Sequence, residues 1–267
     1  MKAFLKKLIR SSGYIIVRAP KGSTGASPTK GNDGEYRIEF IRHDFEGNTY
    51  LVPRYAAHRS AARAILADTY YEPDTHRAVR EVLSRFPGAM VHAGTFFGDM
   101  LPSFSAKAQR VYAFEPALEN FVLANLCKDA NDLQNVVLFN AALTEEVTSV
   151  RINTSAPDGE HFGGGSRVAE SGHLMTGLSI DSLGLSDLSI IQLDVERHEL
   201  SALKGAEQTI RTQRPLVMIE DNLAECDAFL GGLGYTKIAD LKGLGCWASS
   251  DRSGDFDFLK ELEASAD

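Results

Sequence analysis

The clearest pattern along the chain is an alternation of short apolar runs with stretches of helical periodicity. The runs have the length and composition of strands that are buried on both faces of a sheet. They cover residues 89–91, 111–114, 136–139, 190–193 and 216–219, and further strands are expected at 235–238 and 246–248. Helices are expected at residues 99–108, 117–130, 199–212 and 224–233. Because helices that alternate with strands imply parallel strands joined by crossovers, residues 89–250 predict an α/β, doubly wound, Rossmann-like sheet.

The region before this sheet, residues 36–88, predicts a small extension made of a hairpin and helices. Its elements are strand-like runs at 36–41 and 49–52 around the turn Glu46-Gly47-Asn48, then helical patterns at 55–67 and 74–86. Asp74 is the expected N-cap of the second helix, and Pro87-Gly88 is its stop signal. After the sheet, residues 251–267 are expected to form a C-terminal tail.

The N-terminus differs in charge from the rest of the chain. Residues 1–30 contain seven Lys and Arg residues and no acidic residue, whereas the whole chain has a net charge of −8. Within residues 1–19, a short apolar helical face is surrounded by basic side chains. This pattern favours either weak contact with an anionic membrane surface or a short helix that packs on the body or frays in solvent. Residues 20–35 are rich in Gly, Ser, Thr and Pro and predict a flexible linker.

Composition and charge exclude several classes of protein. No apolar run approaches the roughly 20 residues of a membrane-spanning helix, and the N-terminus lacks the apolar core of a secretory signal. The three cysteines are widely spaced and indicate neither a disulfide framework nor a zinc ribbon, so we expect a cytoplasmic, reducing environment. Because the body is acidic, nucleic acid is not expected as a partner.

The residues that follow the predicted strands carry the candidate chemistry, since ligands of such sheets bind beyond the carboxyl ends of the strands. Gly94 and Gly98 bracket the turn after the first strand, and Glu115 follows the second strand, 21 residues after Gly94. An acidic residue at that spacing is placed to accept hydrogen bonds from both hydroxyls of a ribose. The sequence therefore predicts a cofactor of the adenosine type.

The turn between the two glycines distinguishes between such cofactors. A dinucleotide site favours Gly-x-Gly-x-x-Gly, in which the backbone approaches a pyrophosphate, but here Phe96 and Phe97 fill the turn. A nicotinamide-dependent oxidoreductase is therefore the weaker alternative. The bulky loop favours S-adenosylmethionine.

Several segments resemble the FkbM family of S-adenosylmethionine-dependent methyltransferases. The likeness extends from Tyr71 to Asn222 and is most specific between Asp194 and Ala206. It is carried by Tyr71-Glu72-Pro73, Val111-Tyr-Ala-Phe-Glu-Pro116, Asn140-Ala-Ala-Leu143 and Leu193-Asp-Val-Glu-Arg-His-Glu-Leu200. The resemblance implies O-methylation of a hydroxyl on a sugar, a glycan or another small metabolite. It also implies cofactor contacts from His92, Gly94, Thr95, Gly98, Glu115, Asn140 and Ala141.

Two positions depart from the family pattern. His92 stands where the family usually has aspartate, and Arg197 stands where it usually has glycine. A neutral His92 is able to accept a hydrogen bond, whereas a protonated one would repel a cationic cofactor; it is equally consistent with a satisfied residue at the end of a strand. These departures keep a second hypothesis open, a methyltransferase-like binding or scaffold domain that has lost catalysis.

Methyl transfer to a hydroxyl requires positioning and a proton acceptor. Asp194, at the end of the fourth strand, is the first candidate for the base, and His198 and Glu220 are the next. Glu220 also has the simpler interpretation of a structural cap, and His198 that of a surface residue. No metal is expected, although Asp194 and Glu220 together would suit a divalent cation.

Residues 154–177, which include Gly163-Gly164-Gly165-Ser166, are expected to form a long loop, either mobile near the acceptor or merely a solvent-exposed connection. The sequence does not specify the acceptor or the oligomeric state.

Overall fold

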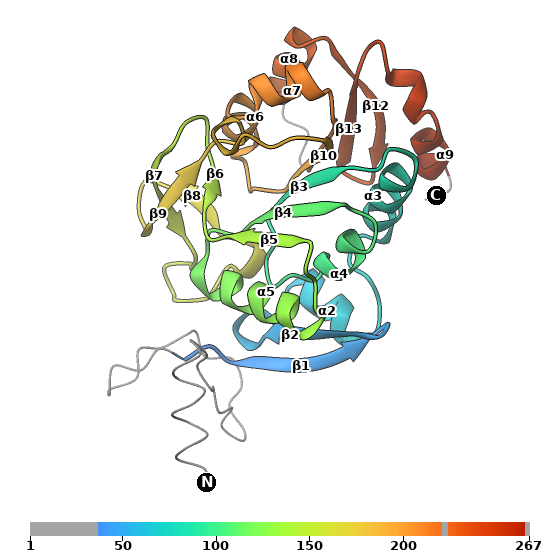
Figure 1. The fold of residues 1–267 in the computed structure, drawn as a ribbon. Helices are drawn as coiled ribbons and strands as arrows, with labels where there is room; N and C mark the ends of the chain where they lie inside the picture. Colours follow the sequence, from blue (N-terminus) through green and yellow to red (C-terminus); the bar gives the residue numbers. More distant parts are fainter. Residues whose placement is uncertain (1–36, 221–223, 265–267) are drawn as a thin grey trace.

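The computed structural model describes residues 37–220 and 224–264, and its centre is a seven-stranded sheet with the strand order β12-β13-β11-β10-β3-β4-β5 (Figure 1). Five neighbouring strands are parallel: β11 (Leu216–Glu220), β10 (Leu188–Leu193), β3 (Ala89–Ala93), β4 (Arg110–Phe114) and β5 (Val136–Phe139). The predicted doubly wound α/β sheet is confirmed. The expected N-terminal segment 1–19 and linker 20–35 lie outside the described residues.

The last two strands depart from the parallel pattern. β13 (Leu244–Ser249) runs antiparallel to both β11 and β12 (Tyr235–Leu241). β12 and β13 are joined by the short turn at Lys242-Gly243. A turn of this length can join only antiparallel strands. The sequence located both strands, but the direction of β13 was not deduced from it.

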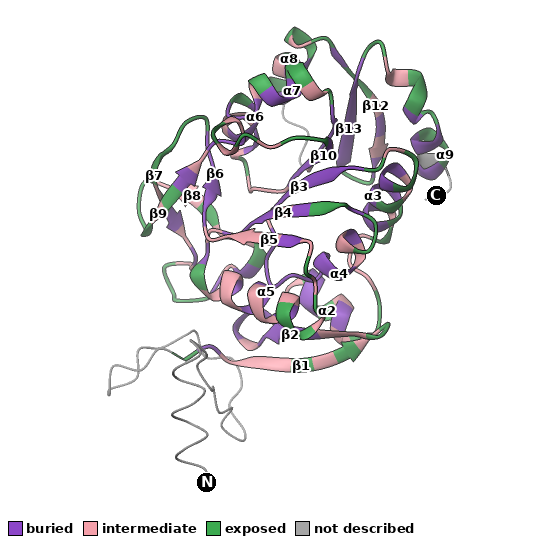
Figure 2. Cartoon of the chain, viewed as in Figure 1, coloured by how far each residue is buried: buried purple, intermediate pink, exposed green. Residues whose placement is uncertain are grey.

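Helices cover both faces of the sheet, and the central strands are buried between them (Figure 2). One face packs against α3 (Pro73–Arg85), α4 (Leu101–Ser105) and α9 (Phe258–Ala264). The other face packs against α6 (Glu199–Lys204), α7 (Glu207–Gln213) and α8 (Ala224–Gly232). The apolar runs of the sequence are thus explained by burial on two sides.

A third apolar cluster attaches the N-terminal extension to the sheet. The hairpin of β1 (Phe40–Phe45) and β2 (Asn48–Pro53) packs with α2 (Ser60–Leu66) against α5 (Leu118–Ala130). A short 3-10 turn, η1 (Arg54–Ala56), precedes α2, so the single helix expected at 55–67 is divided into two pieces. The hairpin therefore lies directly beside the predicted cofactor loop, because Phe96 and Phe97 belong to the same cluster.

Three expectations about helices require correction. The N-cap of α3 is Glu72 rather than Asp74, with Pro73 in the first turn, where its missing N–H has no cost. The helix expected at 199–212 breaks after Lys204, because Gly205 lies so close to the Thr144 carbonyl that a Cβ would be 2.0 Å from it. The segment from residue 251 is not a free tail, since η4 (Ser253–Phe256) and α9 bury apolar side chains in the core.

The segment expected as a long loop contributes two strands to a second, four-stranded sheet. Its order is β6-β9-β7-β8, formed by β6 (Ala142–Leu143), β7 (Thr148–Asn153), β8 (Arg167–Ala169) and β9 (His173–Leu178). We call residues 148–178 the arm. In the chain, the arm lies between β5 and β10, and it projects beside the central sheet (Figure 1). Its glycine-rich stretch forms a 3-10 turn, η2 (Gly163–Gly165). The loop prediction for residues 154–177 was therefore wrong for β8 and β9.

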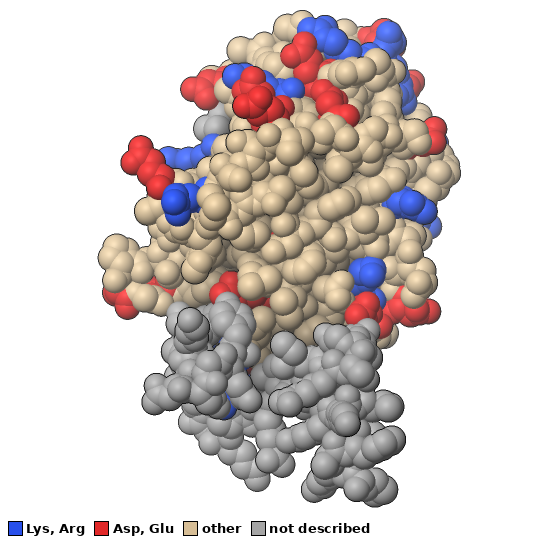
Figure 3. Space-filling view, turned by 60° about the vertical axis from the view of Figure 1, so that its left-hand side comes forward, with Lys and Arg blue, Asp and Glu red and all other residues tan. Residues whose placement is uncertain are grey.

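On the face drawn in Figure 3, the described residues form no continuous basic area. In the face drawn in Figure 3, Lys and Arg side chains lie at the margins and are interspersed with Asp and Glu. Within the described ranges, no helix combines the length and the apolar character needed to cross a bilayer.

Candidate functional site

The carboxyl ends of the parallel strands meet at one edge of the sheet, and the loops that leave them are joined by main-chain hydrogen bonds. The backbone N–H groups of Gly94 and Thr95 both donate to the Phe114 carbonyl, each at 3.2 Å. The Asp194 N–H donates to the Ala93 carbonyl at 3.1 Å. These bonds hold the predicted cofactor loop and the predicted base on adjacent strands.

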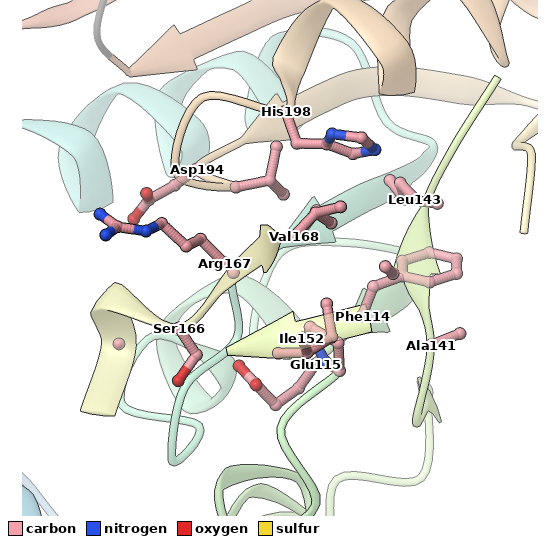
Figure 4. A pocket seen from close by; sticks show the side chains of 16 residues that line it. Phe114, Glu115, Ala141, Leu143, Ile152, Ser166, Arg167, Val168, Asp194 and His198 are labelled. Carbon is pink, nitrogen blue, oxygen red and sulfur yellow. The ribbon is translucent and has the colours of Figure 1, made fainter. Parts of the chain in front are cut away.

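Two adjoining pockets open at this edge. The first, which we call the Glu115 pocket, has about 440 Å³ of empty space, part of it open to solvent, and is largely apolar, with the arm forming one side (Figure 4). Its lining includes Phe114, Glu115, Ala141, Leu143, Ile152, Val168, Val195 and His198. Phe114 is itself stacked on Phe139, with ring centroids 4.8 Å apart. A flat, apolar ligand with polar groups at one side fits such a slot.

The second, which we call the His92 pocket, has a volume of about 710 Å³ and is more polar. Its lining includes Arg59, Tyr71, His92, Phe96, Asp99, Glu196 and Glu220. Gly94, Gly164 and Asp194 line both pockets. A ligand that extends from one pocket into the other would therefore pass Gly94 and Asp194.

Gly94 shows why glycine is required at the start of the loop. Its φ is +88°, in the region that favours glycine, and a Cβ there would lie 1.9 Å from the carbonyl oxygen of Asp194. Gly98 has a φ of +87° and packs closely against α5. Gly98 lines neither pocket and instead allows the loop to approach the helix.

Glu115 is buried, and three donors surround its carboxylate. The Phe96 N–H donates to Oε2 at 2.8 Å, the Ala117 N–H donates to Oε1 at 2.8 Å, and the Asn120 amide donates to Oε1 at 3.3 Å. Burial raises the pKa of Glu115 to about 8, although these three hydrogen bonds favour the charged form and oppose the shift. The carboxylate is thus fixed at the wall of the first pocket.

His92 lies in the floor of the second pocket on β3. Its Nδ1 is hydrogen-bonded to Oε1 of Gln192, its register partner on β10, while Nε2 is buried and has no hydrogen-bond partner among the described residues. Burial lowers the pKa of His92 to about 4, so the imidazole is neutral at neutral pH. Of the two states considered from the sequence, the structure favours the neutral one, which would not repel a cation.

Asp194 and Glu220 come together at the ends of β10 and β11. Burial and the hydrogen-bonded, negatively charged Glu220 raise the pKa of Asp194 well above its usual value, and Glu72 and Glu196 act in the same direction. Glu72 occupies the left-handed region with φ 49° at the start of α3, and its own pKa is raised by burial and by Glu220. The site therefore concentrates carboxyl groups that hold protons unusually tightly.

His198, Thr95 and Asn140 have different surroundings. His198 lines the Glu115 pocket, and its Nε2 is buried without a hydrogen-bond partner among the described residues. Burial lowers its pKa. Thr95 and Asn140 line neither pocket: Thr95 Oγ1 donates to the Phe114 carbonyl at 3.1 Å, and the Asn140 amide donates to the carbonyls of Glu115 (2.9 Å) and Pro116 (3.0 Å). These contacts hold the strand ends that form the pockets.

The two phenylalanines of the loop do not fill the Glu115 pocket. Phe97 is fully buried with the N-terminal hairpin, and Phe96 lies at the wall of the His92 pocket. Arg197 is exposed, with φ 71°, which explains why glycine suits this position. Asp221, next to Glu220, lies outside the described residues.

Sequence reasoning missed two buried polar residues of the site. Asp99 lies in the floor of the His92 pocket, and burial raises its pKa to about 7. Asn120 is completely buried in the first turn of α5 and contacts Glu115. The position of Asp99 directly after Gly98 was an available signal, whereas a single asparagine in a helix carries none.

In the part of the chain that the structure describes, no group of three or more His, Cys, Asp or Glu residues is arranged to hold a metal ion.

Comparison with known proteins gives one family match. Residues 90–236 match the profile of the family described as the methyltransferase FkbM domain. No curated protein sequence matches the chain.

Solved structures give more distant likenesses. An FkbM methyltransferase from Methylobacillus flagellatus aligns with 61% of this chain and 43% of its own length, at 20% identity and a TM-score of 0.42. A methyltransferase from Geobacter sulfurreducens aligns with 66% of this chain and 79% of its own, at 16% identity and a TM-score of 0.42. The tRNA (uracil-54, C5)-methyltransferase of Pyrococcus abyssi, in complex with S-adenosyl-L-homocysteine, aligns with 84% of this chain and 48% of its own, at 12% identity and a TM-score of 0.45. The alignment thus spans less than half of the Methylobacillus protein.

Proposed function

The chain belongs to the FkbM methyltransferase family, and from this premise we propose that it is an O-methyltransferase acting on a hydroxyl of a sugar, a glycan or another small metabolite. Its cofactor is S-adenosylmethionine. The observation that carries the proposal is the meeting of the two pockets at Gly94 and Asp194, with a buried acid in the lining of each, Glu115 in one and Asp99 in the other.

The residues of the Glu115 pocket fit the nucleoside part of this cofactor. The apolar side chains of Phe114, Leu143 and Val168 suit an adenine ring. Glu115 offers carboxyl oxygens to ribose hydroxyls at the same wall, and His198 Nε2 is a buried polar atom with no hydrogen-bond partner in the described part of the chain. Ala141 completes the adenine side of the slot.

The polar pocket fits the charged part of the cofactor and the acceptor. S-adenosylmethionine supplies an electrophilic methyl group on a positively charged sulfur when it is bound. Glu196 and the Asp194–Glu220 pair, which keeps one negative charge when it shares a proton, favour a cation in this pocket, and the neutral His92 does not oppose one. The remaining space, reaching Tyr71 and Asp99, is where the acceptor would bind.

Asp194 is the proposed base. It lies where the two pockets meet, so a hydroxyl placed beside Gly94 would be within reach of its carboxylate. Its raised pKa makes it a stronger proton acceptor than an ordinary aspartate, and Glu220, hydrogen-bonded to it, would share the proton that it takes. Glu220 and His198 are the next candidates for this role.

Transfer of a labelled methyl group tests the proposal. Protein, labelled S-adenosylmethionine and a panel of monosaccharides and methyl glycosides are incubated together, and the methylated product is identified by NMR. We expect a methyl ether on one of these hydroxylated acceptors, and loss of the product in Asp194→Asn. Label found on nitrogen or carbon in place of oxygen, or no transfer to any acceptor of the panel, would contradict the O-methyl assignment.

A further inference from the structure

Asn120 binds three separate segments of the chain at once. Its Oδ1 accepts a hydrogen bond from the Tyr55 hydroxyl at 2.8 Å, and its Nδ2 donates both to Glu115 Oε1 at 3.3 Å and to the Gly163 carbonyl at 3.0 Å. The side chain is completely buried, so each of these bonds replaces one that water would make. One amide therefore connects the N-terminal extension, the proposed ribose acid and the arm.

Phe96 provides a second connection between Glu115 and the glycine turn of the arm. Its N–H donates to the other oxygen of Glu115 at 2.8 Å, and its ring packs on the glycine turn of the arm. A Cβ on Gly163 would lie 3.2 Å from the Phe96 ring, and one on Gly164 would lie 3.4 Å from it. The position of the Glu115 carboxylate and the position of the turn are therefore fixed by shared neighbours.

The turn of the arm separates the two pockets. Gly164 lines both of them, Gly165 lines the His92 pocket, and Ser166, Arg167 and Val168 continue along the Glu115 pocket. A shift of this turn would change the shape of the acceptor space and of the cofactor slot together.

We propose that Asn120 is a positioning residue that couples cofactor binding at Glu115 to the placement of the Gly163–Gly165 turn over the acceptor pocket. The inference rests on the proposed function, because it takes the cofactor ribose as the group that Glu115 holds. Ribose hydroxyls that donate to Glu115 favour the carboxylate position in which the Asn120 amide is oriented toward Gly163. A cofactor that binds more tightly to this position of Glu115 therefore also stabilises the ordered turn. By linkage, the ordered turn raises the affinity for the cofactor by the same factor.

The test combines affinity with local hydrogen exchange. S-adenosylhomocysteine is titrated calorimetrically into the wild-type protein and the variants, and amide exchange of residues 162–168 is followed with and without it. In the wild-type protein we expect the ligand to slow exchange in this turn by about tenfold or more. In Asn120→Ala we expect affinity to fall by about tenfold, as for loss of one hydrogen bond, and the slowing of exchange in the turn to disappear.

Asn135→Ala is the matched control. The Asn135 amide also donates two hydrogen bonds to backbone carbonyls, those of Ser105 and Ala108, each at 2.9 Å, but it contacts neither pocket. It should lower thermal stability without changing affinity or the exchange response. Asn120→Asp serves if Asn120→Ala fails to fold, because it keeps the acceptor for Tyr55, removes both donors and adds a charge beside Glu115. We expect its loss of affinity to be at least as large.

The outcomes separate the two proposals. If the folded wild-type protein does not bind S-adenosylhomocysteine at millimolar concentration, the proposed function is wrong and the coupling is wrong with it. If the ligand binds but exchange in the turn does not change, or if the Asn120 variants behave like Asn135→Ala, the coupling alone is overturned.

Discussion

At the scale of single residues, the site consists of buried polar groups whose chemistry is set by their neighbours. Glu115 keeps its position through main-chain donors, Asp194 binds its proton more tightly beside Glu220, and His92 is neutral because it is buried. The roles of these residues in binding and catalysis can be separated by measuring affinity and turnover independently.

Glu115 is expected to act through cofactor affinity. Above pH 8, where Glu115 is ionised, Glu115→Ala should weaken binding of S-adenosylhomocysteine by about 1.5–3 kcal/mol, the range for hydrogen bonds to a charged group. Glu119→Ala is the control, because Glu119 lies four residues further along the chain, in the first turn of α5, but lines neither pocket. Calorimetry on both variants checks this, and equal affinities for Glu115→Ala and the wild type would show that the ribose is held elsewhere.

Asp194 is expected to act through the chemical step. Asp194→Asn keeps the shape of the side chain but removes its ability to take a proton. Turnover at saturating cofactor should therefore fall by about a hundredfold or more, while the affinity for S-adenosylhomocysteine stays close to that of the wild type. Steady-state kinetics on an acceptor found in the labelling experiment provides the measurement. Near-normal turnover would move the base to His198 or Glu220.

At the scale of secondary-structure elements, prediction from the sequence succeeded where burial leaves a local pattern. The runs that became β3, β4, β5, β10 and β11 are apolar because helices cover both faces. The arm left no such pattern, since β7 (Thr148–Asn153) is mostly exposed or half-buried and β8 has three residues. The break between α6 and α7 depends on Gly205 approaching Thr144, a contact between residues distant in sequence.

The same reason explains how much of the site was predicted. Gly94, Glu115 and Asp194 were placed at the site because residues at strand ends share one edge of the sheet. Asn120 was missed because two of its three partners, Tyr55 and Gly163, are 65 and 43 positions away. Local spacing carries no information about such contacts.

The glycine turn of the arm is sensitive to an added side chain. In Gly163→Ala, a Cβ would lie 2.7 Å from Ala56 and 3.2 Å from Phe96, at a φ of +58°. The turn would have to move, so acceptor turnover and cofactor affinity should both fall. Gly159→Ala is the control, since Gly159 also has a positive φ (+89°) but no atom within 4 Å of the added Cβ. Kinetics on the pair checks the prediction, and equal kinetic effects of the two variants would argue against a role of the turn.

At the scale of the whole molecule, the buried acids make stability depend on pH. In the folded protein, the pKa of Asp99 is about 7 and the pKa of Glu115 is about 8. In the unfolded chain, the two groups have their ordinary pKa values of 3.8 and 4.5. Their contribution is therefore fully present below those ordinary values and is lost as the pH rises through 7 and 8. His76 and His92, whose pKa values are lowered to about 4, contribute stability that is lost only as the pH falls below 6.5.

The free energy of unfolding should accordingly decrease between pH 6.5 and pH 8.5, where the acids titrate and these histidines do not. Chemical denaturation across this range measures the decrease. Asp99→Asn should flatten it, because the amide does not titrate. A free energy of unfolding that does not decrease over this range would mean that Asp99 and Glu115 are already ionised in the folded protein.

Calorimetric titration of the folded protein with S-adenosylhomocysteine is the sharpest test of whether the two pockets form one site for cofactor and acceptor. We expect saturable binding with one ligand per chain, weakened in Glu115→Ala and preserved in Asp194→Asn. Absence of binding at millimolar ligand, with thermal unfolding showing that the protein is folded, would contradict it and would favour a methyltransferase-like domain that has lost its cofactor.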